Sequence, residues 1–296
     1  MSGYDELSIR MKDYEKRQRF YLQKRMPVII RLDMRAGHTF LRDFKRPFDD
    51  VFIKTMQETA LYLCKNIQNV KCSYQQSDEI TLLLVDYDKI TTNRFFEYRI
   101  DKLCSLAAGM ATLEFNKRLE KNVAEYKKAF KKNTTISDID FEKEIEYSKI
   151  LDKAIKKGAI FDARCFNLPK EEVTNNFYWR QMDASRNSIQ MVGQAFFTQK
   201  ELDKKNNNDI QDMLMTRKGI NWNNYPIYKK RGSCCVKTEY AVNDNGKEVE
   251  VDCVTDVDEP VENVTFRSRW IIDTEIPIFK NEGRDYIERF VYLDEK

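Results

Sequence analysis

The sequence has almost no histidine and no pair of cysteines at metal-binding spacing. Its one histidine is His38, and its 7 cysteines are scattered without a CxxC motif. A structural zinc site takes four Cys or His ligands, so we do not expect one. The odd cysteine count, with Cys234 and Cys235 adjacent, argues against a disulfide framework and for reduced thiols inside a cell.

Long apolar runs are missing too, and we do not expect residues 1–20 to be a leader segment. No stretch approaches the roughly 18 apolar residues that a membrane-spanning helix needs. Residues 1–20 lack the apolar core of a signal peptide and hold too many acids for a typical transit peptide. We therefore expect a soluble, intracellular protein without a membrane partner. The expected location is cytoplasmic, with a mitochondrial one left open.

An excess of either charge is also absent. The 51 lysines and arginines nearly balance the 48 aspartates and glutamates, for a net charge of +3. This balance does not indicate a nucleic-acid-binding protein, and a basic surface would require segregated charges. What the chain does have is 42% hydrophobic residues over 296 positions, enough for a core in one large domain or two modest ones.

Two stretches have the pattern of buried strands that meet an acid. The apolar run of residues 28–32 ends at Asp33, and a second run begins at Glu79, directly after Asp78. If the strands are antiparallel neighbours, Asp33 and Asp78 lie at one end of a sheet and can hold two Mg²⁺ ions. Because side chains alternate along a strand, Asp78 and Glu79 face opposite sides, and we take Asp78 as the direct ligand. Taken alone, Asp33 also fits a turn, and the pair fits two ordinary strand-end acids.

The other segments predict a mixture of helices and strands. Helices are expected at 5–25, from 49 or 50 to 64, at 95–119 and at 175–202, and strands at 69–74, at 159–166, after 232 and in the tail from 267. We expect a turn at 243–246, a solvated acidic connection at 252–262 and a loop at 218–231. The elements follow no regular βαβ rhythm, so we predict an α+β fold with an antiparallel sheet.

Residues 117–157 differ from the rest of the chain. They are dense in charge, and their apolar residues are weakly spaced. We expect a charged helical insertion that lies outside the main core, or a flexible one. Its lysines are expected to form a solvated face, with an RNA contact as the alternative.

Six motifs occur in order along most of the chain. They are RLDMRAGHTF, KRPFDD, YQQSDEITLLL, FDARCFNLP, WRQMDASRNSI and KGINWNNYPIYKKRG. In this combination the chain resembles the tRNA(His) guanylyltransferase family, the 3′-to-5′ RNA polymerases, from about Arg10 to Gly232. The resemblance implies one polymerase-palm-like catalytic domain over 1–296, with 159–240 as its nucleotide- and tRNA-contacting part. It also implies two Mg²⁺ per active site, ATP, GTP and other NTPs as substrates, tRNA as partner, and a homotetramer.

The resemblance carries roles over by position. It gives catalytic roles to Asp33, Asp78 and Glu79, and a metal site to Asp33, the Met34 carbonyl and Asp78. The nucleotide-binding positions are Met34, Arg35, His38, Lys45, Arg46 and Ser77. The tRNA- and phosphate-binding positions are Arg180, Asp183, Asn187, Lys229, Lys230 and Arg231. Taken alone, His38 also fits a turn or packing residue, and the charged positions also fit a solvated surface.

The chain departs from the family pattern in two places. The family usually has Gly at the Met34 position, and a carbonyl ligand there tolerates Met only if φ stays negative. Members specific for tRNA(His) carry His-Ile-Asn-Asn after the Asp that is here Asp183, whereas this chain has Ser185-Arg186-Asn187-Ser188. That segment resembles the "-like protein" branch, whose members repair 5′-truncated tRNAs by copying the opposite strand.

We therefore predict a template-dependent 3′-5′ nucleotidyltransferase that extends the 5′ end of truncated tRNA. The 3′-hydroxyl of a nucleotide attacks a 5′ phosphate activated by adenylylation or by an existing triphosphate. Such a reaction needs positioning and charge stabilisation rather than a protein nucleophile, and the chain has no Ser-His-Asp or Cys-His set. The alternatives are a tRNA(His) guanylyltransferase that adds one G, a non-catalytic tRNA-binding relative, and a cyclic-nucleotide synthase on the same palm.

Overall fold

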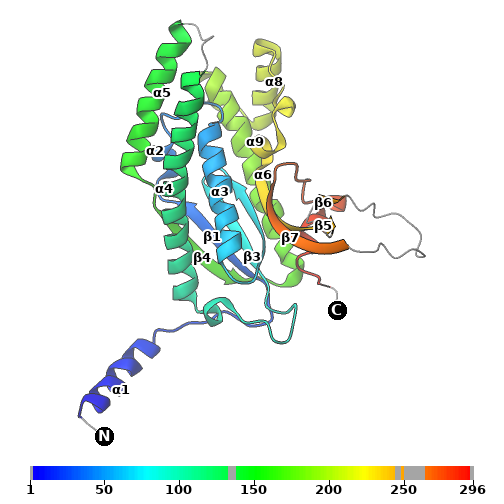
Figure 1. Ribbon diagram of the computed structural model, residues 1–296. Coiled ribbons are helices and arrows are strands. Elements are labelled where there is room, and N and C mark those ends of the chain that lie inside the picture. The colour runs from blue at the N-terminus through cyan, green and yellow to red at the C-terminus, as the bar shows by residue number, and fades with distance from the viewer. Residues whose placement is uncertain (1–2, 133–137, 244–247, 250–263, 294–296) are drawn as a thin grey trace.

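A computed structural model describes residues 3–132, 138–243, 248–249 and 264–293. Within these ranges one antiparallel sheet lies between helices (Figure 1). Its strands are β1 (Val28–Met34), β2 (Val70–Gln76), β3 (Glu79–Leu84), β4 (Phe161–Asn167), β5 (Ser233–Asn243), β6 (Glu248–Val249) and β7 (Val264–Asp273). The order is β4-β1-β3-β2-β5-β6, and β7 also pairs with β5. The predicted α+β class with an antiparallel sheet is confirmed.

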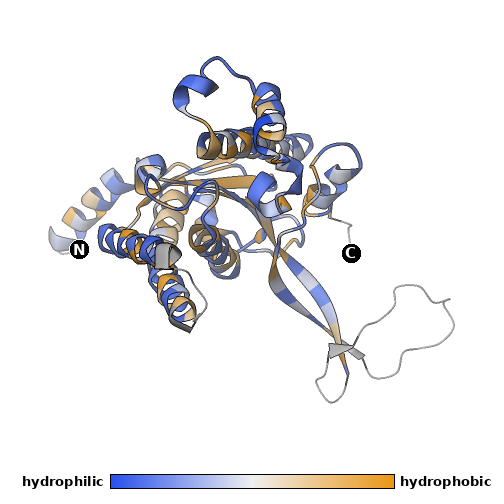
Figure 2. Cartoon of the chain, turned by 90° about the horizontal axis from the view of Figure 1, so that it is seen from above, coloured by the Kyte–Doolittle hydropathy of each residue, from blue (hydrophilic) through white to orange (hydrophobic). Residues whose placement is uncertain are grey.

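Helices cover both faces of the sheet, with α3 and α4 on one and α6 and α10 on the other (Figure 1). The helices are α1 (Gly3–Lys16), α2 (Gly37–Phe40), α3 (Asp50–Asn66), η1 (Phe95–Tyr98), α4 (Ile100–Lys132), α5 (Asp138–Lys157), α6 (Lys170–Phe196), α7 (Gln199–Leu202), α8 (Asn207–Lys218), η2 (Trp222–Asn224), α9 (Ile227–Arg231), η3 (Asn281–Arg284) and α10 (Asp285–Glu288). Helix α1 and the β5–β7 ribbon project from the body (Figures 1 and 2). In the described part of the chain, no helix combines the length and apolarity needed to cross a bilayer.

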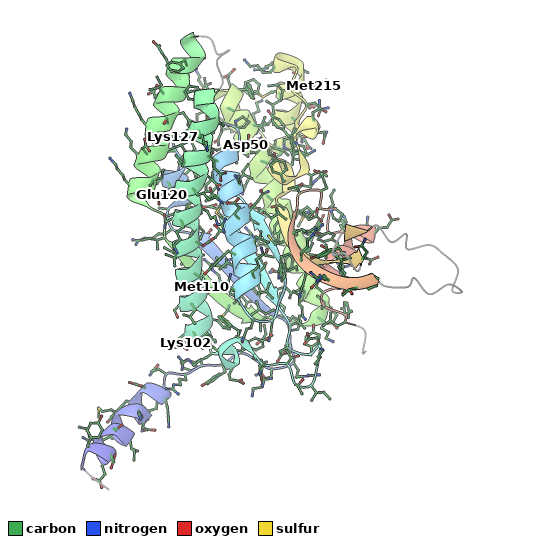
Figure 3. The ribbon with its side chains drawn as sticks, in the orientation of Figure 1. Asp50, Lys102, Met110, Glu120, Lys127 and Met215 are labelled. Carbon is green, nitrogen blue, oxygen red and sulfur yellow. The ribbon has the colours of Figure 1, made fainter. Side chains whose placement is uncertain are left out.

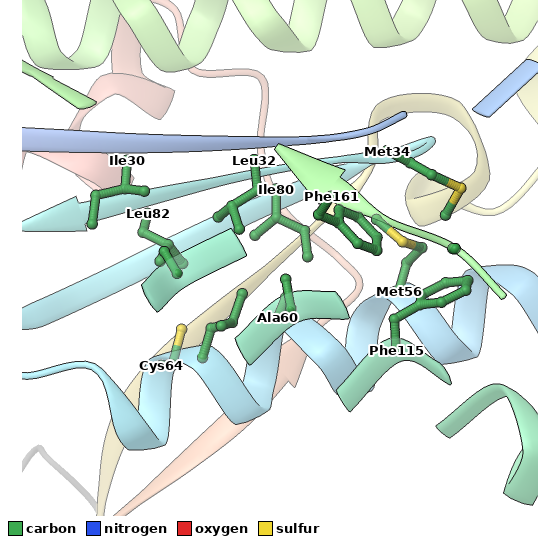
Figure 4. Packing of buried hydrophobic residues seen from close by; sticks show 14 of the residues in the cluster. Ile30, Leu32, Met34, Met56, Ala60, Cys64, Ile80, Leu82, Phe115 and Phe161 are labelled. Atoms are coloured by element: carbon green, nitrogen blue, oxygen red, sulfur yellow. The ribbon is translucent and has the colours of Figure 1, made fainter. Parts of the chain in front are cut away.

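Strand β1 is buried on both faces, which explains its nearly continuous apolar run. Ile30, Leu32 and Met34 belong to the large cluster under α3 and α4 (Figure 4). The intervening Ile29 belongs to the cluster on the α6 face. Side chains that alternate between two buried faces fix the register of the strand, because a slip by one residue would exchange the two sets. The strand end at Asp33 is therefore held in one position.

The expectation that residues 117–157 lie outside the main core is wrong, although they are helical where described. Leu119 and Val123 of α4, and Tyr147 and Leu151 of α5, are at most 5% exposed and belong to the α3–α4 cluster. Each pair has i,i+4 spacing, so each helix presents a narrow apolar stripe. Glu120 and Lys127, which Figure 3 labels, are charged residues of this segment that do not belong to the buried cluster. The few apolar side chains of each helix are buried against the other helix and against the core.

Several element bounds differ from the expected ones. The helix expected at 95–119 is α4, which begins and ends later, and the one expected at 175–202 is α6, which begins and ends earlier. The expected loop at 218–231 contains η2 and α9, and α8 was not predicted. The start of α8 is marked by a capping box of Asn206 and Asp209, a signal present in the sequence. The strand in the tail is confirmed as β7. The expected 252–262 connection and most of the turn at 243–246 fall outside the described residues.

Candidate active site

The ends of β1 and β3 bring acidic side chains together at one end of the sheet. The two strands are antiparallel neighbours, with Asp33 directly opposite Glu79. Ser77 and Asp78 form the tight turn that joins β2 to β3. The Met34 N–H donates to the carbonyl oxygen of Asp78 at 3.2 Å, which ties the end of β1 to this turn. The structure thus places Asp33 and Asp78 at the same sheet end, as the sequence indicated.

A third strand contributes another acid to this end of the sheet, which the sequence did not indicate. On β4, Asp162 lies directly opposite Asp33. Directly opposed residues of an antiparallel pair project from the same face, so Asp162, Asp33 and Glu79 share a face of the sheet. Asp162 is exposed and pairs with Arg164 at 3.6 Å. Cross-strand register, which decides this neighbourhood, is not visible in a single sequence.

Burial and the repulsion of neighbouring acids raise the pKa of both Asp33 and Asp78. Burial raises the pKa of Asp33, and the nearby charges of Asp78 and Asp162 raise it further. Burial also raises the pKa of Asp78, partly offset by hydrogen bonds from its own backbone and from Ser77. A divalent cation bound between Asp33 and Asp78 would offset this effect, because it stabilises the charged form of each carboxyl.

Replacing Asp33 with Asn is expected to stabilise the metal-free protein at neutral pH by roughly 1–3 °C in Tm. A carboxyl whose pKa is raised on folding opposes folding above that raised pKa, and the opposition disappears below its usual value of 3.8. The gain from Asn should therefore be full near pH 7 and shrink as the pH falls toward 3.8. Thermal unfolding in EDTA at several pH values measures it. A Tm that falls at pH 7 would contradict this electrostatic reading.

The donor set around Asp33 and Asp78 fits Mg²⁺ better than a zinc-type metal. Within the described ranges, no group of three or more His, Cys, Asp or Glu side chains could hold a metal ion. Mg²⁺ needs only one or two carboxylates, completed by a carbonyl, waters and substrate phosphates. Met34 can offer that carbonyl, because it ends an extended strand and is not among the residues with positive φ. The left-handed positions nearby are Ala36 and Ser77, at φ 55° and 47°.

Gly37, which sequence reasoning did not single out, packs against the carboxylate of Asp78. A Cβ at this position would lie 1.8 Å from Asp78 Oδ2 and 2.8 Å from its Cγ. Side-chain carbon atoms do not approach other atoms so closely, so only glycine leaves the Asp78 carboxylate in place. The signal in the sequence was the glycine within RLDMRAGHTF.

A cleft of about 400 Å³ opens beside Asp78, a size suited to a nucleotide. It lies between the α2 segment, the loop before α3, the β2–β3 turn, α6 and α9. Its lining brings together eight predicted positions: His38, Lys45, Arg46, Ser77, Asp78, Asn187, Lys229 and Lys230. The other predicted positions are not part of this lining: Asp33, Met34, Arg35, Glu79, Arg180, Asp183 and Arg231.

The predicted cations of the cleft differ in what holds them. The Lys45 ammonium donates to Glu144 of α5 at 2.6 Å, and Lys229 pairs with Asp50 at 2.6 Å. Lys230 is buried and donates to the carbonyl of Asn223, and burial together with Arg231 lowers its pKa. Arg46 is exposed. These cations all line the cleft, but they have different partners, so we do not assign them one common function.

Arg180 holds α6 to the sheet rather than facing the cleft. It pairs with Glu79 of β3 at 2.8 Å and with Asp183 of its own helix at 2.7 Å. The side chains of Arg180 and Glu79 are only 12% and 10% exposed. This network fixes the position of α6 over the acidic end of the sheet.

Replacing Arg180 with Ala is expected to lower the free energy of unfolding by about 3–5 kcal/mol, because Glu79 is left as a buried, unpaired charge. The matched control is Arg186→Ala. Arg186 reaches the same Asp183 at 3.8 Å, but its side chain is 73% exposed, and its loss should change stability by no more than about 0.5 kcal/mol. Urea unfolding of both variants gives the comparison. Equal losses would show that burial of the network is unimportant.

The segment Ser185–Ser188 has its two hydroxyls engaged inside the protein. Ser185 donates to the Gln181 carbonyl at 3.0 Å, and Ser188 donates to the Ser185 carbonyl at 2.8 Å. Ser188 also accepts from the indole nitrogen of Trp222 at 3.1 Å. Asn187 is exposed and lines the cleft, whereas Arg186 is exposed outside its lining.

The chain is similar to known proteins over most of its length. A family model described as tRNA(His) guanylyltransferase matches residues 8–169. A solved bacterial tRNA(His) guanylyltransferase-like protein in complex with ATP is 38% identical, with a TM-score of 0.74, covering 97% of this chain and 100% of that chain. The structure of such a bacterial protein in complex with GTP is 35% identical, with a TM-score of 0.70 and the same coverage. The tRNA(His) guanylyltransferase of Kluyveromyces lactis is 25% identical over 250 residues, which are 78% of this chain and 88% of the relative.

The family model covers more than half of the 296 residues, and the sheet that carries Asp33 and Asp78 lies largely within the matched range. The palm-like antiparallel sheet, the acidic strand ends and the neighbouring cleft agree with that match. The chain belongs to the tRNA(His) guanylyltransferase family and is a nucleotidyltransferase that acts on tRNA.

Proposed function

We propose that this protein repairs the 5′ end of truncated tRNA by adding nucleotides in the 3′-to-5′ direction, each chosen by pairing with the opposite strand. A nucleotide 3′-hydroxyl loses its proton and attacks the activated 5′ phosphate, and the bond from that phosphate to its leaving group breaks, which releases AMP from an adenylylated end or pyrophosphate from a triphosphate end. The proposal includes two Mg²⁺ ions per site and the homotetramer that the family resemblance implies. ATP, GTP and other NTPs are its nucleotide substrates.

The segment Ser185–Ser188 is the observation that favours repair over the addition of a single G. By the family resemblance it occupies the position at which tRNA(His)-specific members have His-Ile-Asn-Asn, and its serines form hydrogen bonds within the protein. A bacterial guanylyltransferase-like protein is 38% identical over 97% of this chain, which supports the same assignment. A side chain that reads one particular base is not expected in this segment.

The α6 wall of the cleft supports selection by base pairing. Asn187, Gln190 and Gln194 line it with amide groups, beside the apolar Met191. An amide offers both a donor and an acceptor, so it does not prefer one base by charge. Such a wall can hold any of the four bases, while the opposing strand decides which one remains.

Asp33, Asp78 and the Met34 carbonyl would hold the metal in this reaction. A metal ion held by these groups would supply charge stabilisation, both for the deprotonated 3′-hydroxyl and for the leaving group. The chain positions these groups through the β1–β3 register and through the bond from Met34 N–H to Asp78. His38 and Arg46 stand at the cleft as donors for nucleotide phosphates.

Comparing truncated tRNAs tests the proposal. The protein is incubated with Mg²⁺, NTPs and 5′-truncated forms of tRNA(His) and of an unrelated tRNA, and product lengths are read on a sequencing gel. We expect both tRNAs to be extended until their acceptor stems are fully paired. Addition of one G to tRNA(His) alone would instead identify a tRNA(His) guanylyltransferase. Binding of both tRNAs without extension would identify a non-catalytic relative.

A further inference from the structure

The loop before α3, residues 45–49, forms part of the cleft wall and is also held by the α4–α5 pair. All five of its residues line the cleft. Away from the cleft, Tyr126 of α4 and Glu144 and Tyr147 of α5 contact the loop. These contacts come from the segment 117–157, to which the proposed function gives no role.

The ammonium of Lys45 is held by these side chains, although the side chain is 41% exposed. Its ammonium donates to the Tyr126 hydroxyl at 2.7 Å and to Glu144 Oε1 at 2.6 Å. It also lies 4.4 Å from the ring centroid of Tyr147 and 5.1 Å from that of Tyr126, within cation–π range. Burial works against this charge, but Glu144 and Tyr126 outweigh it and raise the pKa of Lys45. These contacts anchor Lys45 to the α4–α5 pair, which we call the α4–α5 arm.

Asp49, at the other end of the loop, is held by the same arm. Its Oδ1 accepts from Phe52 N–H at 2.9 Å and so caps α3, and its Oδ2 accepts from Lys45 N–H at 3.1 Å. The hydroxyl of Tyr147 donates to the same Oδ2. Burial and the Asp49 charge raise the pKa of Tyr147, so the phenol remains a donor at any working pH. One tyrosine therefore touches both ends of the loop.

Arg46 lies between these two anchors and, like Lys45, lines the cleft, but in the described part of the chain only Lys45 of the two is paired with a carboxylate. It is exposed, and its hydrogen bond to the carbonyl of Arg42 is a long one, at 3.5 Å. A guanidinium offers five donors in a planar fork that suits phosphate oxygens. With the backbone on both sides fixed, less freedom is lost when Arg46 binds an anion.

We propose that the α4–α5 arm positions the nucleotide-binding loop. In this arrangement Lys45, Glu144 and Tyr147 are positioning residues, and Arg46 is the residue that meets the triphosphate of the incoming nucleotide. Lys45, which the sequence placed among the nucleotide-binding residues, acts through the arm instead. This extends the proposed function, because it takes the cleft as the nucleotide site.

The test is ATP binding to the full-length protein in Mg²⁺, measured by calorimetry without tRNA. Tyr147→Phe keeps the ring and removes the hydroxyl that holds Asp49. We expect it to weaken ATP binding roughly threefold to tenfold, an effect about as large as the net contribution of one ordinary hydrogen bond. In nucleotide addition the KM for NTP should rise by a similar factor while kcat changes less than about twofold. Glu144→Gln, on a partly exposed side chain, should act in the same direction.

Three further variants separate positioning from direct contact and from simple destabilisation. Arg46→Met should weaken ATP binding more than Lys45→Met does. The effects of Lys45→Met and Tyr147→Phe should not add, because both act through one loop. Asp152→Asn removes a different α4–α5 ion pair, to Lys127 at 2.6 Å, and should leave ATP binding unchanged.

Two results would overturn the proposal. One is a Tyr147→Phe protein with a lower Tm and wild-type affinity for ATP, which would make the arm a merely structural support. The other is a loss from Lys45→Met that equals the loss from Arg46→Met and adds fully to that from Tyr147→Phe, which would place Lys45 on the phosphates. ATP binding needs no tRNA, so either result is separate from a failure of tRNA repair.

Discussion

Asp33→Asn and Asp78→Asn are each expected to reduce nucleotide addition by at least about 10³-fold while leaving the protein folded. Each removes a charge from the pair that would hold the metal, and metal activation supplies several kcal/mol to phosphoryl transfer. Single-turnover rates on a 5′-triphosphorylated truncated tRNA measure the chemical step. The metal-free variants should unfold at or above the temperature of the wild type, because the charge they lose opposes folding.

The matched control for these variants is Asp86→Asn. Asp86 follows β3 beyond its other end, is 1% exposed, and accepts from Arg25 N–H at 3.0 and 3.1 Å. Losing its charge should lower Tm and leave the rate per folded molecule near that of the wild type. The two ends of one sheet should thus give opposite results. Asp33→Asn and Asp78→Asn should lose activity and keep their stability, whereas Asp86→Asn should lose stability and keep its activity. Normal activity in Asp33→Asn would refute the metal assignment.

Gly37→Ala is expected to lower activity by about 10²-fold or more, although no charged group is removed. The new methyl group would overlap the Asp78 carboxylate at 1.8 Å and force either that side chain or the α2 segment to move. A displacement of about 1 Å at a reacting centre is enough for an effect of this size. The rate of nucleotide addition at saturating Mg²⁺ and NTP measures it, and near-normal activity would contradict the packing described here.

Gly109→Ala provides the control for Gly37→Ala. Gly109 is an exposed residue of α4, and a Cβ added there would meet no neighbouring atom within 4 Å outside its own helix backbone. Alanine in the interior of a helix is more favourable than glycine by about 1 kcal/mol, so this variant should be slightly more stable. Its activity should not change. The same substitution then has a large effect only where the glycine meets Asp78.

The acidic sheet end could be predicted because each of its parts is marked locally. The β-branched run ending at Asp33 and the apolar run beginning at Glu79 show where two strands stop, and antiparallel pairing puts the stops together. The position of Asp162 could not be predicted in the same way. It depends on β4 pairing with the far side of β1, across more than a hundred residues of chain.

The role of the charged segment 117–157 was missed for a similar reason. Leu119 and Val123 make a stripe too narrow to indicate burial, and only the pairing of α4 with α5 and the core completes it. The environment of Lys45 is likewise built by Glu144, about a hundred residues away in sequence. A lysine beside Arg46 and a proline looks like a phosphate ligand until its distant partners are known.

Template-dependent repair is tested most directly with one truncated tRNA in four versions that differ only in the base opposite the first missing position. Each version is incubated with the wild-type protein, Mg²⁺ and the four NTPs, and the added nucleotide is identified. We predict that the complement of the opposing base is added in every version, and that Asp33→Asn adds none. Addition of G whatever the opposing base, or no addition by the wild-type protein, would contradict template-dependent repair.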